Sequence, residues 1–498
     1  MEIQFRQEGC PYLRSAVCQY QTQEQTQEVR LPDSMPDIGR VLGCWGQILI
    51  RGKEWRGSGM MVSGGVMAWV LYVPEDGSKP ASMECWIPFQ MRWDFPQTQR
   101  DGSILVDPVL RSMDARSTSA RKLMVRANIG ATGQALEPAE EQISVAEGIP
   151  EDVQLLKKSY PMMLPLEYGE KLFDVEEELP FPDGKPCPEK VLHYDVQPEV
   201  LEHKVMAGRL VFRGKANVHM LYQDESDGWK SWECELPFSQ YAQLDRDYSG
   251  AADADIQMVL TSLDLQRDEN NRMQLKCQMA GQYVICDRVM VDVAEDAYSP
   301  VREVELQQQE MKLPYRLDRV RKELSITGEG GAVASQIFDV CCMTDDVKIL
   351  QNGNEMQVTV PVKIQVLYAD ENGELQSSVI SGKGECVIPS APGNHTRVKQ
   401  YISQPRANQT ADSIAIGAEC QLDMDIFAEE GNPMVSGVRL GEITEPDPNR
   451  PSLILRSCGE EQLWDIAKKC NTTVEAIRSA NQLECEPEKG QILLIPVP

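Results

Sequence analysis

An internal repeat with a period near 150 residues constrains the fold of this chain more than any other feature. Each copy contains an apolar run that ends in Leu-Tyr and leads into an acidic stretch and a Gly: WVLYVPEDG (69–77), HMLYQDESDG (219–228) and QVLYADENG (365–373). The Leu-Tyr pairs are 150 and then 146 residues apart. An apolar run followed by acidic residues and Gly is typical of a strand that enters a turn. The sequence therefore predicts three copies of one β-rich unit.

Further matches at nearly the same offset support the first two copies. MECWIPF (83–89) corresponds to WECELPF (232–238), and VLRSMD (109–114) corresponds to VLTSLD (259–264). The third copy has diverged more, and it keeps the Leu-Tyr strand and a closing strand. Tyrosine recurs at the same place in all three copies, so we expect these side chains to serve the fold and not a site: Tyr72, Tyr222 and Tyr368.

The closing strand of the third copy has the clearest two-residue alternation in the chain. Between residues 414 and 426 the even positions are apolar or small, and the odd positions 419–425 carry Glu, Gln, Asp and Asp. This pattern predicts a half-buried strand whose acidic face points to solvent. Residues 123–129 and 275–279 have the same pattern in the other copies. Because helical patterns are scarce here, we expect a mainly β fold of three tandem antiparallel, sandwich-like repeats.

These matches divide the chain into successive units. We expect the first repeat, with an N-terminal extension, in 1–150, the second in 151–298 and the divergent third in 299–443. Segments ahead of the repeat cores, such as 28–50 and 171–200, add strands or join one unit to the next. The Pro-rich stretch 180–188 fits a flexible linker equally well. The sequence TEPDPNRP (444–451) predicts a linker to a different module in 452–498.

The C-terminal module predicts a β-α-α-β order, which makes it a small α+β domain. Leu463, Ile466 and Ala467 have the spacing of one helix face. Thr472 and Glu475 form a capping-box pattern that opens a second helix. A short strand is expected on either side, at 453–455 and 492–495.

This module closely resembles a LysM domain over its whole length. The resemblance rests on LWDIA (463–467), TVEAI (473–477), AN (480–481) and GQILLIP (490–496). It implies two helices packed on one side of a two-stranded sheet, and binding of N-acetylglucosamine polymers such as peptidoglycan. The implied groove lies between two loops and contains Gly459, Glu460, Glu461, Gln462, Leu463, Trp464, Asn481, Leu483, Gly490, Gln491 and Ile492.

One departure from the LysM pattern bears on the ligand. The family usually carries Gly-Asp-Thr or Gly-Asp-Ser before the first helix, where this chain has Glu460-Glu461-Gln462. Losing the small Gly removes room for a close backbone contact, and the added carboxylate repels anionic ligands. A protein ligand is therefore an alternative to a glycan. Trp464 fits either a stacking contact with a ligand or half-buried packing.

Three β-rich repeats followed by one LysM module resemble the SPOCS-domain sporulation proteins. The Leu-Tyr and Pro-Phe motifs and the opening Leu31-Pro32-Asp33 carry this resemblance. It implies a non-enzymatic scaffold for spore-coat assembly in the mother-cell cytoplasm, at the forespore surface. The implied partners are other coat proteins and a coat morphogenetic ATPase of the SpoIVA type, which the LysM module would bind. The alternative is a peptidoglycan-binding protein of the cortex or cell wall.

Composition and missing motifs exclude several other classes. A net charge of −28 argues against nucleic acid as a partner, because phosphate contacts need clustered Lys and Arg. We expect no signal peptide, no membrane span, no catalytic residues and no cofactor. The 15 cysteines contain no CxxC pair, so we expect reduced thiols. His193, His203 and His219 lie close in sequence, but core or surface positions are favoured over a metal site.

Overall fold

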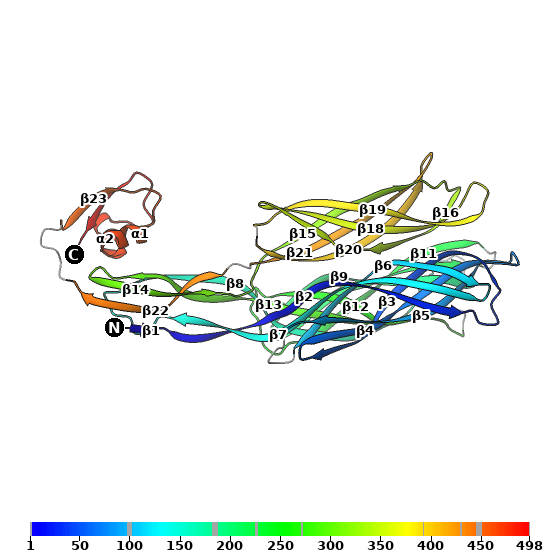
Figure 1. Ribbon diagram of the computed structural model, residues 1–498, viewed down its shortest axis with the longest axis horizontal. Helices are drawn as coiled ribbons and strands as arrows, with labels where there is room; N and C mark the ends of the chain where they lie inside the picture. Colours follow the sequence, from blue (N-terminus) through cyan, green and yellow to red (C-terminus); the bar gives the residue numbers. More distant parts are fainter. Residues whose placement is uncertain are drawn as a thin grey trace.

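The chain forms an elongated body with three β-rich lobes at one end and a small α+β module at the other (Figure 1). The computed structural model describes residues 2–96, 102–181, 188–224, 228–269, 272–391, 393–428, 431–444 and 451–497. A narrow stalk of paired strands joins the lobes to the small module. The predicted mainly β fold class is confirmed.

Each lobe contains one repeat and is built from antiparallel strands. The first repeat has β2 (Arg6–Arg30), β3 (Ile38–Arg56), β4 (Gly59–Pro74), β5 (Ala81–Asp94), β6 (Ser103–Ser119) and β7 (Lys122–Val145). The second has β8 (Gln154–Glu178), β9 (Lys190–Met206), β10 (Arg209–Gln223), β11 (Trp229–Gln243), β12 (Asp253–Arg267) and β13 (Met273–Tyr298). The third has β14 (Arg302–Met311), β15 (Arg316–Gly330), β16 (Gln336–Thr344), β17 (Lys348–Asn352), β18 (Glu355–Ala369), β19 (Leu375–Pro389), β20 (His395–Gln409), β21 (Ile414–Phe427) and β22 (Asn432–Ile443).

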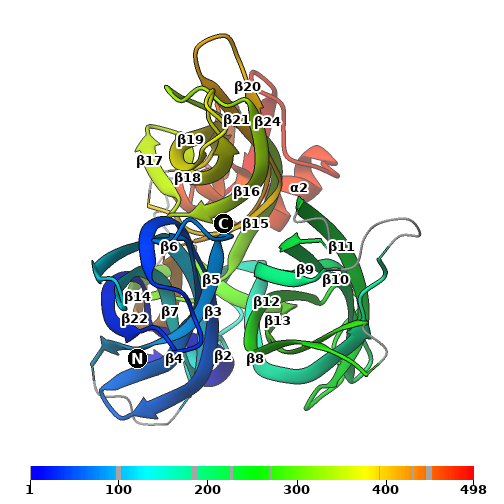
Figure 2. The same cartoon turned by 90° about the vertical axis from the view of Figure 1, so that its right-hand side faces the viewer.

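The same strand order recurs in the three lobes. In the first, one sheet has the order β2-β7-β6 and the other β3-β4-β5. The second repeats this as β8-β13-β12 and β9-β10-β11. In the third, β15 and β20 flank β21, while β16 and β19 flank β18, and two residues of β15 also pair with β19. Viewed along the long axis, the three lobes surround a common centre (Figure 2).

Alternating apolar side chains fill the space between the two sheets of each lobe. In the third lobe, all seven even-numbered residues of β21 from Ile414 to Ile426 are at most 4% exposed. The recurrent tyrosines are buried too, at 0%, 1% and 8% exposure for Tyr72, Tyr222 and Tyr368. The predicted alternation is thus confirmed, and so is the expectation that the tyrosines serve the fold.

The acidic face of β21 does not point freely to solvent, which corrects one expectation. The side chain of Asp425 is only 8% exposed and pairs with Arg319 at 2.7 Å. Asp423 pairs with Arg321, and Glu419 pairs with Arg406. The alternation correctly separated the two faces, but it could not show that arginines from neighbouring strands cover the acidic one.

The stalk was not predicted. The strands β2, β8 and β14 begin at Arg6, Gln154 and Arg302, so their starts are spaced by 148 residues. The first halves of β2 and β8 pair with the ends of β7 and β13. Strand β14 pairs with β22 along its whole length, and β1 (Glu2–Gln4) adds to the β22 edge. Apolar side chains from all three ribbons form a shared core: Cys10, Tyr12, Ile143, Met162, Leu164, Val291, Val293, Met311, Leu313 and Met434.

The C-terminal module follows the predicted β-α-α-β order. Its elements are β23 (Leu453–Ser457), α1 (Leu463–Lys469), α2 (Val474–Asn481) and β24 (Ile492–Pro496), and β23 pairs antiparallel with β24. The predicted capping box at Thr472 is wrong by one residue. Thr473 is the N-cap of α2, and its side chain accepts a hydrogen bond from the Ala476 N–H. Thr472 is instead 1% exposed, so its hydroxyl lies inside.

The segments ahead of the repeat cores add strands to the repeats. Residues 28–50 contribute to β2 and β3, and residues 171–200 contribute to β8 and β9. Residues 182–187 of the Pro-rich stretch and 445–450 of the expected linker lie outside the described residues.

The 14 cysteines in the described part of the chain are all free thiols. Within that same part, no helix is long and apolar enough to cross a membrane.

Candidate functional site

The candidate binding groove lies on the C-terminal module, whose core holds its two helices against the sheet. Leu463, Ile466 and Ala467 of α1 are fully buried, as is Ile477 of α2. They pack on Leu493 and Ile495 of β24, which are also 0% exposed. The predicted helix face is confirmed, and the connecting loops are left at the surface.

Two of these loops, 458–462 and 482–491, lie side by side and are tied together by backbone hydrogen bonds. The Cys458 N–H donates to the carbonyl of Gln491 at 2.8 Å, and the Gly490 N–H donates to the carbonyl of Cys458 at 2.8 Å. Gly490 has a φ of +90°, a conformation that disfavours any residue with a side chain. The loops therefore form one continuous surface, which we call the loop pair.

Carboxylates dominate the loop pair. Glu460 is exposed and forms an ion pair with Lys489 at 2.7 Å. Glu461 accepts hydrogen bonds from Lys469 and Arg456, and the bond from Lys469 lowers the pKa of its carboxyl. Glu486 accepts a hydrogen bond from the Leu463 N–H at 2.9 Å, which occupies a free donor at the start of α1. The loop pair holds five carboxylates and one lysine, which disfavours a negatively charged ligand. Arg456, Lys469 and Arg478, which lie outside the loops, offset part of this charge through their ion pairs.

Nine of the eleven predicted groove residues fall into two groups. Gly459, Glu460, Gln462, Gly490, Gln491 and Ile492 are exposed, and Ile492 is 69% exposed. Leu463 lies in the core, and Leu483 is partly buried against it. The side chain of Asn481 donates to the carbonyls of Ile477 and Leu494 and accepts from the Leu494 N–H at 2.7 Å, so it joins α2 to β24.

Trp464 contacts the stalk and docks the module on it. Its indole N–H donates to Asp296 at 2.8 Å, and its ring lies edge-on to Tyr298 with centroids 4.8 Å apart. Lys468 forms an ion pair with the same Asp296 at 2.8 Å. The Tyr298 hydroxyl donates to the carbonyl of Thr472 at 2.9 Å. Packing, the second of the two roles foreseen for Trp464, is the one in this structure.

Sequence reasoning missed this docking contact. Asp296 and Tyr298 lie about 170 residues before their partners, and nothing in the local pattern of β13 marks Asp296. Tyr298 itself gave a weak indication of a contact, because it is a large aromatic residue at the end of a stalk strand, just before a turn. Burial raises the pKa of Tyr298 to about 12, so its hydroxyl stays a neutral donor at physiological pH.

The outer face of the small sheet carries exposed apolar side chains. Leu453 and Leu455 of β23 are 48% and 70% exposed, and Ile492 of β24 lies on the same face. A contiguous apolar patch beside charged loops is typical of a protein contact surface.

Two family matches agree with this geometry. Residues 188–266 match the family described as SipL, SPOCS domain, and residues 460–496 match the LysM domain family. The first match covers most of β9 to β12 in the second repeat, and the second covers α1, α2 and β24. No curated protein and no solved structure matches the chain significantly. The chain therefore carries a SipL-type SPOCS domain and a C-terminal LysM domain, both of which are binding-type modules and not enzymatic ones.

Proposed function

We propose that this SPOCS and LysM protein is a non-enzymatic scaffold for spore-coat assembly, and that its LysM module binds a coat morphogenetic protein. The partner we favour is an ATPase of the SpoIVA type, in the mother-cell cytoplasm at the forespore surface. We also propose that the first and third repeats are SPOCS domains, because they share the strand order of the matched second repeat.

One observation supports a protein partner above all. Trp464, the aromatic side chain of α1, is engaged by Asp296 and Tyr298 of the stalk. It is therefore not free to stack on a sugar while the module is docked. The surface that remains open combines carboxylates of the loop pair with the apolar sheet face at Leu453 and Leu455.

The elongated shape suits a scaffold. The LysM module and the three lobes lie at opposite ends of the body (Figure 1), so each end can hold a different partner. The second candidate function is binding of peptidoglycan, which the LysM family match itself favours.

A co-sedimentation experiment separates the two functions. The full chain and a chain that ends at Thr444 are incubated either with insoluble peptidoglycan or with the immobilised SpoIVA-type ATPase. We expect the ATPase to retain only the full chain, and peptidoglycan to retain neither. Retention of the full chain by peptidoglycan, with none by the ATPase, would overturn the scaffold proposal.

A charge variant sharpens the result. Replacing Glu460 and Glu488 by Gln removes two exposed carboxylates from the loop pair without touching the core. If acidity excludes the glycan, peptidoglycan binding should appear in this variant, and binding of the ATPase should weaken. A matched change outside the loop pair, Glu475→Gln on the exposed surface of α2, should alter neither.

A further inference from the structure

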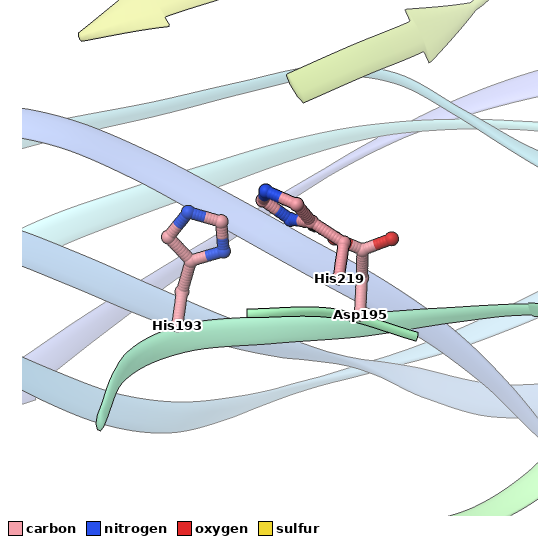
Figure 3. Close-up of side chains that lie close together, drawn as sticks. All are labelled: His193, Asp195 and His219. Carbon is pink, nitrogen blue, oxygen red and sulfur yellow. Dashed lines mark hydrogen bonds and ion pairs between the residues drawn. The ribbon is translucent and has the colours of Figure 1, made fainter. Parts of the chain in front are cut away.

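Two histidines and two aspartates lie where the lobes meet, outside the LysM module. His193 and Asp195 are two residues apart on β9, so both side chains project from the same face. His219 lies directly opposite Asp195 in the register of β10. Figure 3 shows the three side chains together on this face. One ligand atom from each of the three residues lies within 4.8 Å of the others.

A β-bulge occurs at the same place in all three repeats and positions this face. The register shifts between Val41 and Gly43, between residues 191 and 193, and between Ile337 and Asp339. Bulges of this kind re-aim the side chain that follows them. Gly43, His193 and Asp339 are thus equivalent residues, because they pair with the Leu of each Leu-Tyr motif.

Different residues occupy the equivalent positions in the other repeats. The cross-strand pair Asp195–His219 corresponds to Trp45–Trp69 in the first repeat and to Cys341–Gln365 in the third. Both other repeats form the same strands without a His-Asp-His set. The fold of a repeat therefore does not require this set, and its polar side chains need another explanation.

Asp339 of the third repeat fixes the orientation of both histidines. Its two carboxylate oxygens contact Nε2 of His193 at 2.8 Å and Nε2 of His219 at 2.9 Å. An ionised carboxylate only accepts hydrogen bonds, so both Nε2 atoms carry the proton. Because both Nε2 atoms are engaged in this way, the Nδ1 atoms are the ones available as ligands.

The two Nδ1 atoms differ in their surroundings. Nδ1 of His193 is buried without a hydrogen bond, in a residue that is 1% exposed, and the Trp45 ring stacks on the imidazole at 4.5 Å. Nδ1 of His219 lies 3.1 Å from a carboxylate oxygen of Asp195. When the proton of His219 is on Nε2, that contact joins two acceptors. It is favourable only with a proton or a cation between them.

An acidic cavity reaches Asp195 and His219, two of the three residues. It has a volume of about 640 Å³, lies between the second and third repeats, and is lined by Asp195 and His219. Its walls carry five further carboxylates and one lysine: Glu199, Glu233, Glu235, Glu323, Glu419 and Lys215. Such a cavity concentrates cations and provides an entry path for one.

We propose that His193, His219 and Asp195 bind a divalent transition-metal ion, with Zn²⁺ as the best fit. Two imidazole nitrogens and one carboxylate oxygen are ligands that Zn²⁺ accepts, with a further position left to water from the cavity. Asp339 is a positioning residue, since a carboxylate that holds the far nitrogen of a metal-bound histidine orients the ring. The ion would link β9 and β10, through Asp339, to β16 of the third repeat.

The test uses the full chain, freed of metal with a chelator and then titrated with Co²⁺, whose visible spectrum reports its ligands. We expect one Co²⁺ per chain with the absorption of nitrogen and oxygen ligation, and displacement by Zn²⁺. Asp195→Asn should weaken Co²⁺ binding by about tenfold or more, because it removes the anionic ligand. The Asp195 side chain is 32% exposed, so the variant should still fold. Zn²⁺ should raise the Tm of the wild type more than that of this variant.

The matched control is His395→Asn, which removes an exposed imidazole far from the cluster in sequence and should bind Co²⁺ like the wild type. Equal Co²⁺ binding by the wild type and Asp195→Asn would overturn the proposal. An intense thiolate-to-Co²⁺ absorption would also overturn it, since cysteines would then be the ligands. A wild type that binds no Co²⁺ would show that a proton holds the contact between His219 and Asp195.

Discussion

At the scale of single residues, partly buried ion pairs between the second and third repeats contribute to the response to acid. Asp253 accepts hydrogen bonds from His203 at 2.8 Å, Arg316 at 2.6 Å and Arg319 at 2.7 Å. Burial alone raises the pKa of the Asp253 carboxyl. The His203 hydrogen bond and the charges of Arg319 and Arg316 outweigh that effect and lower the pKa below its usual value.

The sign of the pH dependence follows from this lowered pKa. A carboxyl whose folded pKa is lowered contributes stability above its unfolded pKa of about 3.9, and this contribution is lost as the pH falls toward the folded value. We therefore expect Asp253→Asn to be less stable than the wild type at neutral pH, and to lose less free energy of unfolding between neutral pH and about pH 3. Urea denaturation at both pH values measures this. Asp94→Asn, at a side chain that is 71% exposed, should follow the wild type. Parallel pH curves for wild type and Asp253→Asn would contradict the assignment.

At the scale of elements, α1 serves as the docking surface between the LysM module and the stalk. Asp296 at the end of β13 accepts the hydrogen bond of Trp464 and the ion pair of Lys468. A hydrogen bond to a charged group contributes about 1.5–3 kcal/mol, and an exposed ion pair contributes less than about 1 kcal/mol. The Trp464 contact therefore dominates the docking.

We expect Asp296→Ala to release the module without unfolding it. Backbone hydrogen exchange should rise at 294–298 and 463–469, which lose the contact, and stay unchanged at 492–496 inside the module. Lys489→Ala breaks only the exposed ion pair with Glu460 and should leave all three segments unchanged. If exchange at 463–469 stays at the wild-type level in Asp296→Ala, the docking contact is not the one that holds the module.

At the scale of the whole molecule, sequence periodicity predicted what is local and missed what is long-range. Alternation along 414–426 identified a strand and its buried face, because burial of one face needs only the two-residue period. Helix spacing identified α1 for the same reason. Asp339 could not be linked to His193 in this way, because their contact depends on how two repeats pack.

The same distinction between local and long-range contacts applies to the candidate site. The loops at Gly459 and Gly490 could be predicted, because the LysM resemblance carries them as a local motif. The docking of Trp464 on Asp296 could not, since it joins two modules. The His-x-Asp pattern at 193–195 with His219 was a usable signal, because strand pairing in the repeat places these residues together once β9 and β10 are aligned.

The shared stalk core predicts that the repeats do not fold independently. Met162 and Leu164 of the second repeat pack on Met311, Leu313 and Met434 of the third. A chain that ends at Tyr298 lacks these three partners, and its exposed apolar surface should bind a hydrophobic dye and self-associate.

The control is a chain that ends at Thr444, which lacks only the LysM module and keeps every residue of this core. We expect it to remain monodisperse in size-exclusion chromatography, with dye fluorescence close to that of the full chain. If the chain that ends at Tyr298 is monodisperse and binds no dye, the first two repeats fold without the third. The ribbons of the stalk would then associate only after each repeat has formed.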